Sequence, residues 1–132
     1  MLEVSAGVII ADSKILCFQK GESKYPYLSY KFEFPGGKIE KGETPEQALV
    51  RELSEELEMD VSNSRIEPLC ETFFNYPDFS VRIHSFLIFM KKVNYKLSEH
   101  RKAVWSTIDT IEDLDWMPAD LEIVKILGDY HG

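Results

Sequence analysis

The 132-residue sequence is poor in cysteine and has no long hydrophobic run. Its two cysteines, Cys17 and Cys70, lack the Cys-x-x-Cys spacing of zinc and redox sites, so we expect two reduced thiols and no disulfide. No apolar stretch reaches the roughly 18 residues of a membrane span. No basic segment precedes the first apolar stretch, as a signal peptide requires. These absences predict a cytoplasmic protein without membrane attachment.

Basic residues are also scarce, because 15 Lys and Arg face 23 Asp and Glu and the formal net charge is −8. A protein that grips the nucleic-acid backbone needs clustered Lys and Arg. We therefore expect no direct nucleic-acid binding. The acidic balance does not exclude a phosphorylated small molecule, because a divalent cation can supply the positive charge.

Length and an apolar content of 44% predict one domain over residues 1–132, without repeats or linkers. Residue types and turn signals predict strands at 2–11, 14–20, 31–34, 66–76, 79–93 and 102–107. Pro35-Gly36-Gly37 is expected to close the third strand. Helices are expected from Thr44, over 109–114, and over about 119–127. The order of strands, helix, strands and helix predicts an α+β sandwich around a mixed sheet.

The start of the first helix is clearly marked. Thr44 is the expected N-cap, Pro45 the first helical residue, and Gln47 the third member of a capping box. An apolar stripe toward the core consists of Ala48, Leu49, Leu53 and Leu57.

Three glutamates on this helix, Glu52, Glu55 and Glu56, stand at spacings that put their carboxylates on one face. Like charges there repel, so the cluster is favourable only if it is fully solvated or binds a cation. Hard oxygen ligands select Mg²⁺, Mn²⁺ or Ca²⁺. Glu43 and Arg51, eight positions apart, are expected to pair across the junction of loop and helix.

The spacing of these residues is that of a known family. Gly37, Glu43 and the segment Arg51-Glu52-Leu53-Ser54-Glu55-Glu56 resemble the Nudix box, GX5EX7REUXEE. The wider stretch FEFPGGKIEKGETPEQALVREL and the tail WMPAD resemble the MutT-like and CTP-pyrophosphohydrolase-like branch. The resemblance implies a Nudix-type α/β/α sandwich with a mixed sheet. It also implies a nucleoside triphosphate pyrophosphohydrolase.

Family members bind Mg²⁺ or Mn²⁺ through the glutamates of the box. The resemblance therefore implies Glu52, Glu55 and Glu56 as metal ligands, together with the carbonyl of Gly36. Glu99 resembles a further acidic ligand or base, and the alternative is an exposed loop glutamate. Bound cations would neutralise phosphate oxygens and lower the pKa of the attacking water.

The implied catalytic residues are Glu52, Glu99 and Arg51. Either Glu52 or Glu99 is implied as the general base, and Arg51 holds the carboxylates by charge-assisted bonds. Attack on the β-phosphorus would release a nucleoside monophosphate and pyrophosphate. Such an activity serves nucleotide-pool sanitation and DNA repair.

The resemblance also implies residues that bind the substrate. Phe34 and Tyr76 fall where the family stacks aromatic rings on the base, and core packing is the alternative for both. Lys38 and Lys20 are candidates for phosphate contacts. An ordinary surface role is the alternative for each, and for Lys20 it is preferred.

Asp120 is the residue that is expected to select the base. The MutT protein itself has asparagine at the matching position, and an ionised aspartate only accepts hydrogen bonds. An acceptor suits the amino group of cytosine. The substrates implied are dCTP, CTP or 5-methyl-dCTP, with 8-oxo-dGTP as the other option. The alternative for Asp120 is the N-cap of the last helix, and one residue could serve both roles.

The chain departs from the family pattern at Glu58, where glycine usually ends the helix in a left-handed turn. We expect a slightly longer helix or a different turn, because glutamate in that conformation costs about 1–2 kcal/mol. We assign no role to His84, His100 or His131.

Two other functions compete with the triphosphate hydrolase. One is a Nudix module that senses a nucleotide without cleaving it, and the complete metal cluster disfavours it. The other is a hydrolase of a different nucleoside diphosphate derivative, which the MutT-like tail disfavours. The sequence leaves open whether the protein is a monomer or a dimer.

Overall fold

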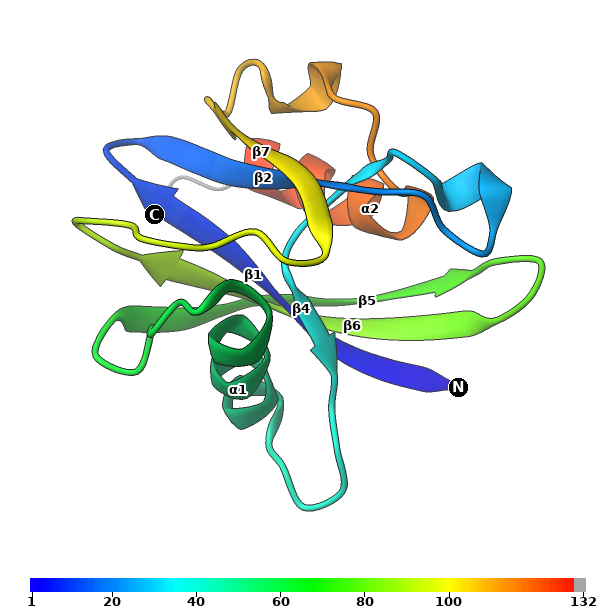
Figure 1. Cartoon of the computed structure of the whole chain (residues 1–132), viewed down its shortest axis with the longest axis horizontal. Coiled ribbons are helices and arrows are strands. Elements are labelled where there is room, and N and C mark those ends of the chain that lie inside the picture. Colours follow the sequence, from blue (N-terminus) through cyan, green and yellow to red (C-terminus); the bar gives the residue numbers. More distant parts are fainter. Residues whose placement is uncertain (130–132) are drawn as a thin grey trace.

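The computed structural model describes residues 1–129, so His131 and the end of the expected domain lie outside the described residues. Seven strands form one sheet and two α-helices pack on it (Figure 1). The strands are β1 (Leu2–Ala11), β2 (Lys14–Lys20), β3 (Phe32–Glu33), β4 (Gly36–Lys38), β5 (Arg65–Asn75), β6 (Ser80–Phe89) and β7 (His100–Ser106). The helices are α1 (Pro45–Leu57) and α2 (Pro118–Gly128), with short 3-10 turns η1 (Pro26–Leu28) and η2 (Ile111–Asp113).

The sheet is mixed, as expected. Its main path runs β3-β2-β1-β6-β5, with β4 paired to β1 and β7 paired to β2. Strands β1 and β6 run parallel, with Leu2 opposite Val81 and Ile10 opposite Phe89. The other pairs are antiparallel. Neither α-helix of the described chain has the length and apolar run needed to cross a membrane.

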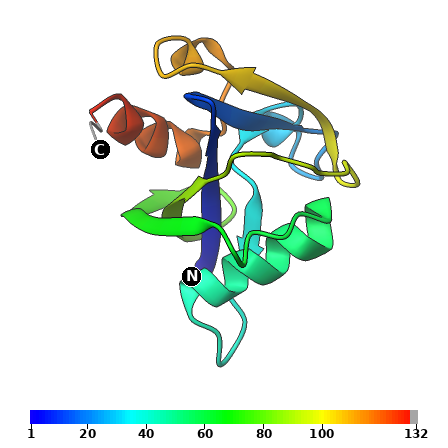
Figure 2. The same cartoon turned by 90° about the vertical axis from the view of Figure 1, so that its left-hand side faces the viewer.

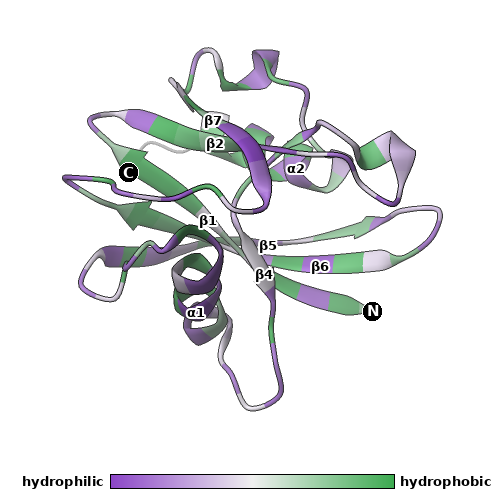
Figure 3. Cartoon of the chain, viewed as in Figure 1, coloured by the Kyte–Doolittle hydropathy of each residue, from purple (hydrophilic) through white to green (hydrophobic). Residues whose placement is uncertain are grey.

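Both faces of the sheet are buried, each under one helix. Figure 2 shows α1 and α2 on opposite sides of β1, and in Figure 3 the strands β1 and β6 are largely apolar. Alternate strand residues enter different cores because successive side chains point to opposite faces. The core under α1 contains Ile9, Leu16, Phe18, Leu49 and Leu53. The core under α2 contains Val8, Ile15, Cys17, Ile123 and Val124. The expected α/β/α sandwich is confirmed.

Three expected elements differ clearly from the structure. The segment 35–37 does not simply close a strand, because Gly36 and Gly37 pair with β1 as part of β4. A Cβ on Gly36 would lie 1.9 Å from the carbonyl oxygen of Ser5, so only glycine allows this approach. The strand expected to reach residue 93 ends at Phe89, because its partner β1 ends at Ala11. The helix expected over 109–114 is only the 3-10 turn η2.

The end of α1 also differs from expectation. The helix stops at Leu57, and Glu58 itself adopts the left-handed conformation, with φ 51° and ψ 37°. Its backbone N–H donates to the carbonyls of Leu53 and Ser54. Glutamate therefore takes the conformation that glycine favours, and both expected alternatives, a longer helix and a different turn, are wrong.

Candidate active site

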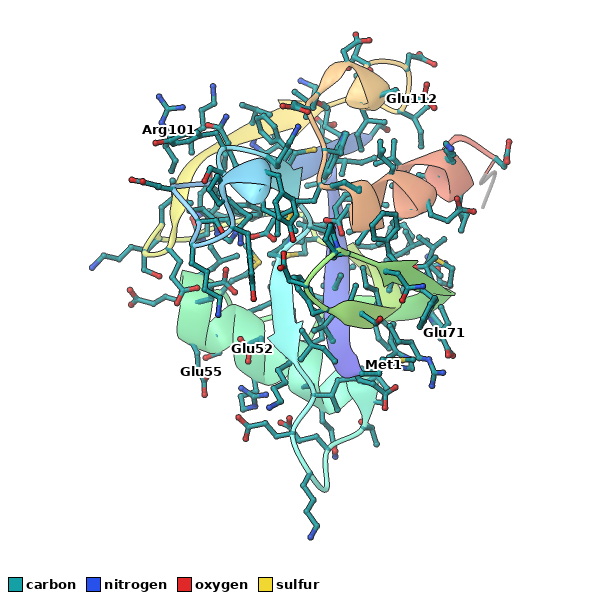
Figure 4. The ribbon with its side chains drawn as sticks, turned by 90° about the vertical axis from the view of Figure 1, so that its right-hand side faces the viewer. Met1, Glu52, Glu55, Glu71, Arg101 and Glu112 are labelled. Atoms are coloured by element: carbon teal, nitrogen blue, oxygen red, sulfur yellow. The ribbon has the colours of Figure 1, made fainter. Side chains whose placement is uncertain are left out.

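The predicted capping box fixes where α1 begins, and so which residues of the helix face the core. The Gln47 backbone N–H donates to Thr44 Oγ1 at 3.1 Å, and the Thr44 N–H donates to Gln47 Oε1 at 2.9 Å. The apolar stripe is then fully buried, because Ala48, Leu49, Leu53 and Leu57 are each 0% exposed. The glutamates of the acidic cluster lie outside this stripe. Figure 4 shows two of them, Glu52 and Glu55, on α1.

All five N–H groups of Arg51 donate hydrogen bonds to other residues of the chain. It binds Glu43 in a bidentate pair, with Nε–Oε2 at 2.7 Å and Nη2–Oε1 at 2.9 Å, as expected. Nη1 donates to Glu52 at 2.9 Å and to Glu55 at 3.1 Å. Nη2 also donates to the carbonyl of Lys38 at 3.0 Å. The guanidinium lowers the pKa of Glu43 to about 2 and links α1 to β4.

Gly37 lies directly against the Glu52 carboxylate. A Cβ built on Gly37 would be 2.4 Å from the carboxyl carbon and from Oε2. The absence of a side chain at the first position of the box therefore leaves room for that carboxylate. Glu52 is held from one side by Arg51 and lies against bare backbone on the other.

Glu56 has a different environment, which sequence reasoning missed. Its side chain is 10% exposed and lies 3.3 Å from Nδ1 of His100, whose other nitrogen bonds Glu33. Burial raises the pKa of Glu56 to about 7, and His100 opposes the shift. Nearby carboxylates of Glu33, Glu99 and Glu52 add to it. The only signal of this contact in the sequence was that Glu33 stands between two apolar residues in the expected strand 31–34.

A cavity of about 360 Å³ lies beside β4, the strand whose Gly37 contacts Glu52 of the acidic helix. Two of its lining residues, Gly36 and Gly37, belong to β4, so the cavity reaches the backbone that contacts Glu52. The rest of its wall includes the predicted residues Phe34, Tyr76 and Asp120, and also Lys20, Glu33 and Tyr25.

Both predicted aromatic residues are core residues and also line the cavity. Phe34 is 4% exposed, and its ring lies 4.6 Å from that of Trp116. Tyr76 is 7% exposed, and its hydroxyl accepts a 2.9 Å hydrogen bond from the Ala119 backbone N–H. Burial raises the pKa of Tyr76 to about 12. Core packing and stacking on a bound base are therefore compatible interpretations for both residues.

Asp120 is buried in the cavity wall and is not the N-cap of the last helix. Helix α2 begins at Pro118, with Met117 as its N-cap, so Asp120 is the third helical residue. Its Oδ2 accepts a 2.9 Å hydrogen bond from the Phe34 backbone N–H. Burial raises the pKa of Asp120 to about 8, and the carboxylate of Glu33 adds to the shift.

This raised pKa corrects the expectation that Asp120 only accepts hydrogen bonds. A carboxyl group with a pKa of about 8 carries its proton at neutral pH. The protonated group has one O–H donor as well as acceptor oxygens. Asp120 can then both donate and accept a hydrogen bond, as an asparagine side chain does.

The remaining predicted residues differ in how close they lie to the cavity. Lys20 lines it, with its ammonium 4.0 Å from Glu33, although the sequence favoured Lys38. Lys38 is exposed at the end of β4. Glu99 is exposed and directly precedes β7, close enough to Glu56 to raise its pKa.

The donor set fits hard divalent cations, although its carboxylates are held apart. Within residues 1–129, no three His, Cys, Asp or Glu side chains are gathered as a metal-binding group. Arg51 holds Glu52 and Glu55, whereas Glu56 faces His100. Hard carboxylate oxygens within two turns of one helix suit these cations.

Comparison with known proteins agrees with this geometry. The family model described as NUDIX domain matches residues 1–127. The 8-oxo-dGTP diphosphatase of Escherichia coli is 29% identical over 126 residues, which cover 96% of this chain and 95% of that protein. The CTP pyrophosphohydrolase of Escherichia coli is 30% identical over 126 residues, covering 95% and 90%. The solution structure of the E. coli ORF135 protein has a TM-score of 0.80 at 28% identity, covering 98% of this chain and 89% of that one.

Proposed function

The chain belongs to the Nudix family and is a Nudix hydrolase, and on that basis we propose that it hydrolyses a modified or cytosine-type nucleoside triphosphate to a nucleoside monophosphate and pyrophosphate. The observation that carries this proposal is that Gly37, in the wall of the cavity, lies against the Glu52 carboxylate of α1. The cavity has an aromatic wall with Asp120 at one part and Gly36 and Gly37 at another. A base in the cavity and a triphosphate running toward Glu52 fit that arrangement.

The acidic residues supply the proposed chemistry. Glu52, Glu55 and Glu56, with the carbonyl of Gly36, would hold Mg²⁺ or Mn²⁺. When bound, such a cation neutralises phosphate oxygens and lowers the pKa of the attacking water. Arg51 orients Glu52 and Glu55 through its hydrogen bonds.

The proton of the attacking water needs an acceptor from the chain. Glu52 and Glu99 are the two candidates for this general base. Glu52 is already fixed by Arg51 and by the backbone of Gly37, whereas Glu99 is exposed at the start of β7. Lys20, in the cavity wall, would contact a phosphate more readily than Lys38.

The chemistry of Asp120 supports two substrate classes equally. A protonated Asp120 can accept from the amino group of cytosine, or donate to the carbonyl oxygen of a guanine while accepting from its N–H edge. Relatives of this chain carry both kinds of name, 8-oxo-dGTP diphosphatase and CTP pyrophosphohydrolase. We therefore propose a cytosine-type or an oxidised guanine nucleoside triphosphate as the substrate, for nucleotide-pool sanitation.

A substrate panel tests the proposal. The protein is incubated with Mg²⁺ and dCTP, 5-methyl-dCTP, 8-oxo-dGTP or dGTP, and pyrophosphate and orthophosphate are measured separately. We expect pyrophosphate from a cytosine nucleotide or from 8-oxo-dGTP, and the loss of turnover in Glu56→Gln with the fold retained. Nucleotide binding without pyrophosphate would instead indicate a sensing module. Orthophosphate as the sole product would indicate that a different bond is cut.

A further inference from the structure

His100, to which the sequence assigned no role, lies between two acidic residues of the site. Its Nε2 forms a 2.9 Å hydrogen bond with Oε2 of Glu33, which lines the cavity. Its Nδ1 faces Oε1 of Glu56 at 3.3 Å. One imidazole thus connects the wall of the cavity with the acidic face of α1.

The ring is buried and fixed by its surroundings. The side chain of His100 is 2% exposed, and its ring centroid lies 5.0 Å from that of Phe18. The strand register pairs His100 with Lys20 on β2. Phe18 is covered in turn by Tyr95, at 5.7 Å between ring centroids. These contacts leave the imidazole little freedom to turn away from the two carboxylates.

The segment before His100 is bonded to the same helical turn that carries Glu56. The Ser98 hydroxyl donates to the backbone carbonyl of Glu56 at 2.7 Å. The Lys96 N–H donates to the carbonyl of Leu57 at 2.8 Å. These two hydrogen bonds fix the segment before β7 to the end of α1, and the imidazole of His100 lies next to the Glu56 side chain.

One nitrogen of the ring is not satisfied. His100 Nδ1 is fully buried, and no hydrogen-bond partner for it is found among residues 1–129, because the contact with Glu56 is poorly aligned. Buried polar atoms in native proteins nearly always have a partner. The acceptor in reach is the Glu56 carboxylate, so the ring favours orientations of that carboxylate that approach Nδ1.

We propose that His100 is a positioning residue that orients the Glu56 carboxylate for a divalent cation and ties it to Glu33 in the cavity wall. The inference rests on the proposed function, because it takes Glu56 as a metal ligand. Carboxylates that bind metals are commonly held by hydrogen bonds from neighbouring side chains, and loss of such a partner typically weakens metal binding about 10–100-fold.

Two amide substitutions separate the contacts of the ring. The asparagine amide in His100→Asn can place an N–H near the position of Nδ1, toward Glu56. The glutamine amide in His100→Gln can place one near Nε2, toward Glu33. His100→Phe keeps a ring and removes both nitrogens. His84→Gln is the matched control, because His84 also lies between two carboxylates, Glu3 at 3.1 Å and Glu71 at 3.9 Å, on another part of the sheet.

The assay is Mn²⁺ alone titrated into each protein, with free Mn²⁺ read by electron paramagnetic resonance and thermal melting followed in parallel. We expect His100→Phe and His100→Gln to bind Mn²⁺ about tenfold or more weakly, with His100→Asn closer to wild type and His84→Gln unchanged. A purely structural role would move the three His100 variants in proportion to their losses in Tm.

Three results would overturn the inference, and they are distinguishable. Wild-type affinity in His100→Phe would show that the ring does not orient Glu56. Equal weakening in the Asn, Gln and Phe variants, in step with Tm, would assign His100 to packing. A wild-type protein that binds no Mn²⁺ would overturn the metal site of the proposed function, and the positioning role with it.

Discussion

Replacing Gly37 by alanine tests whether β4 places the Glu52 carboxylate. A Cβ at this position would lie 2.4 Å from the carboxyl carbon and 2.8 Å from Oε1, whereas ordinary contacts begin near 3.4 Å. The carboxylate must therefore move away by about 1 Å. The atoms displaced are the far end of a flexible side chain, so the backbone of β4 and β1 need not shift.

This displacement sets the expected size of the effect. A misplacement of about 1 Å in a reacting group can cost about 100-fold in rate. Stability should change little, because the new methyl group displaces no backbone and alanine restricts the unfolded chain, an effect of about 0.4–1 kcal/mol in favour of folding. Gly37→Ala is therefore expected to lose activity while it keeps its fold.

The assay measures pyrophosphate release at saturating Mg²⁺ with the best substrate of the panel, together with Tm. Gly21→Ala is the control, because a Cβ on Gly21 would meet no atom within 4 Å. We expect the control to behave as wild type. Near-wild-type turnover in Gly37→Ala would refute the reasoning, since the Glu52 carboxylate would then not depend on β4. A collapse of Tm would refute it too, because the strain would lie in the fold.

Three further predictions concern stability. Glu58→Gly should stabilise the protein by about 1 kcal/mol, because it relieves a left-handed glutamate at the end of α1, and an unchanged midpoint of urea unfolding would contradict this. Saturating Mg²⁺ should stabilise it by about 2.7 kcal/mol at 100 times the dissociation constant, so a Tm equal to that in chelator would count against the cation site. Asp120 has a folded pKa of about 8 against an ordinary 3.8, so its contribution is full below pH 4 and is lost as pH rises to 8. Asp120→Asn should flatten that decline in Tm, and an unchanged slope would show that Asp120 does not cause it.

The parts of the site that follow from local sequence were predictable. The capping box at Thr44 and Gln47 fixes where α1 begins, and the helical repeat then separates the buried leucines from the glutamates. The pairing of Glu43 with Arg51 follows from the same geometry, because the two residues flank the junction of loop and helix.

The parts that depend on strand pairing were not predictable. The pairing of β7 with β2 brings His100 beside Glu33 and Glu56, which lie 67 and 44 positions away in the chain. Nothing near His100 in the sequence marks that contact. Asp120 was misjudged for a similar reason, since the burial that keeps its proton comes from segments as distant as Phe34.

The most direct test is the location of Mn²⁺ in crystals soaked with the ion and a non-hydrolysable triphosphate. Anomalous scattering identifies the cation without assumptions about its ligands. We predict a peak bounded by the carboxylates of Glu52, Glu55 and Glu56, with the triphosphate beside it. No peak there, with Arg51 still holding Glu52 and Glu55 and Glu56 still facing His100, would contradict the proposed metal site.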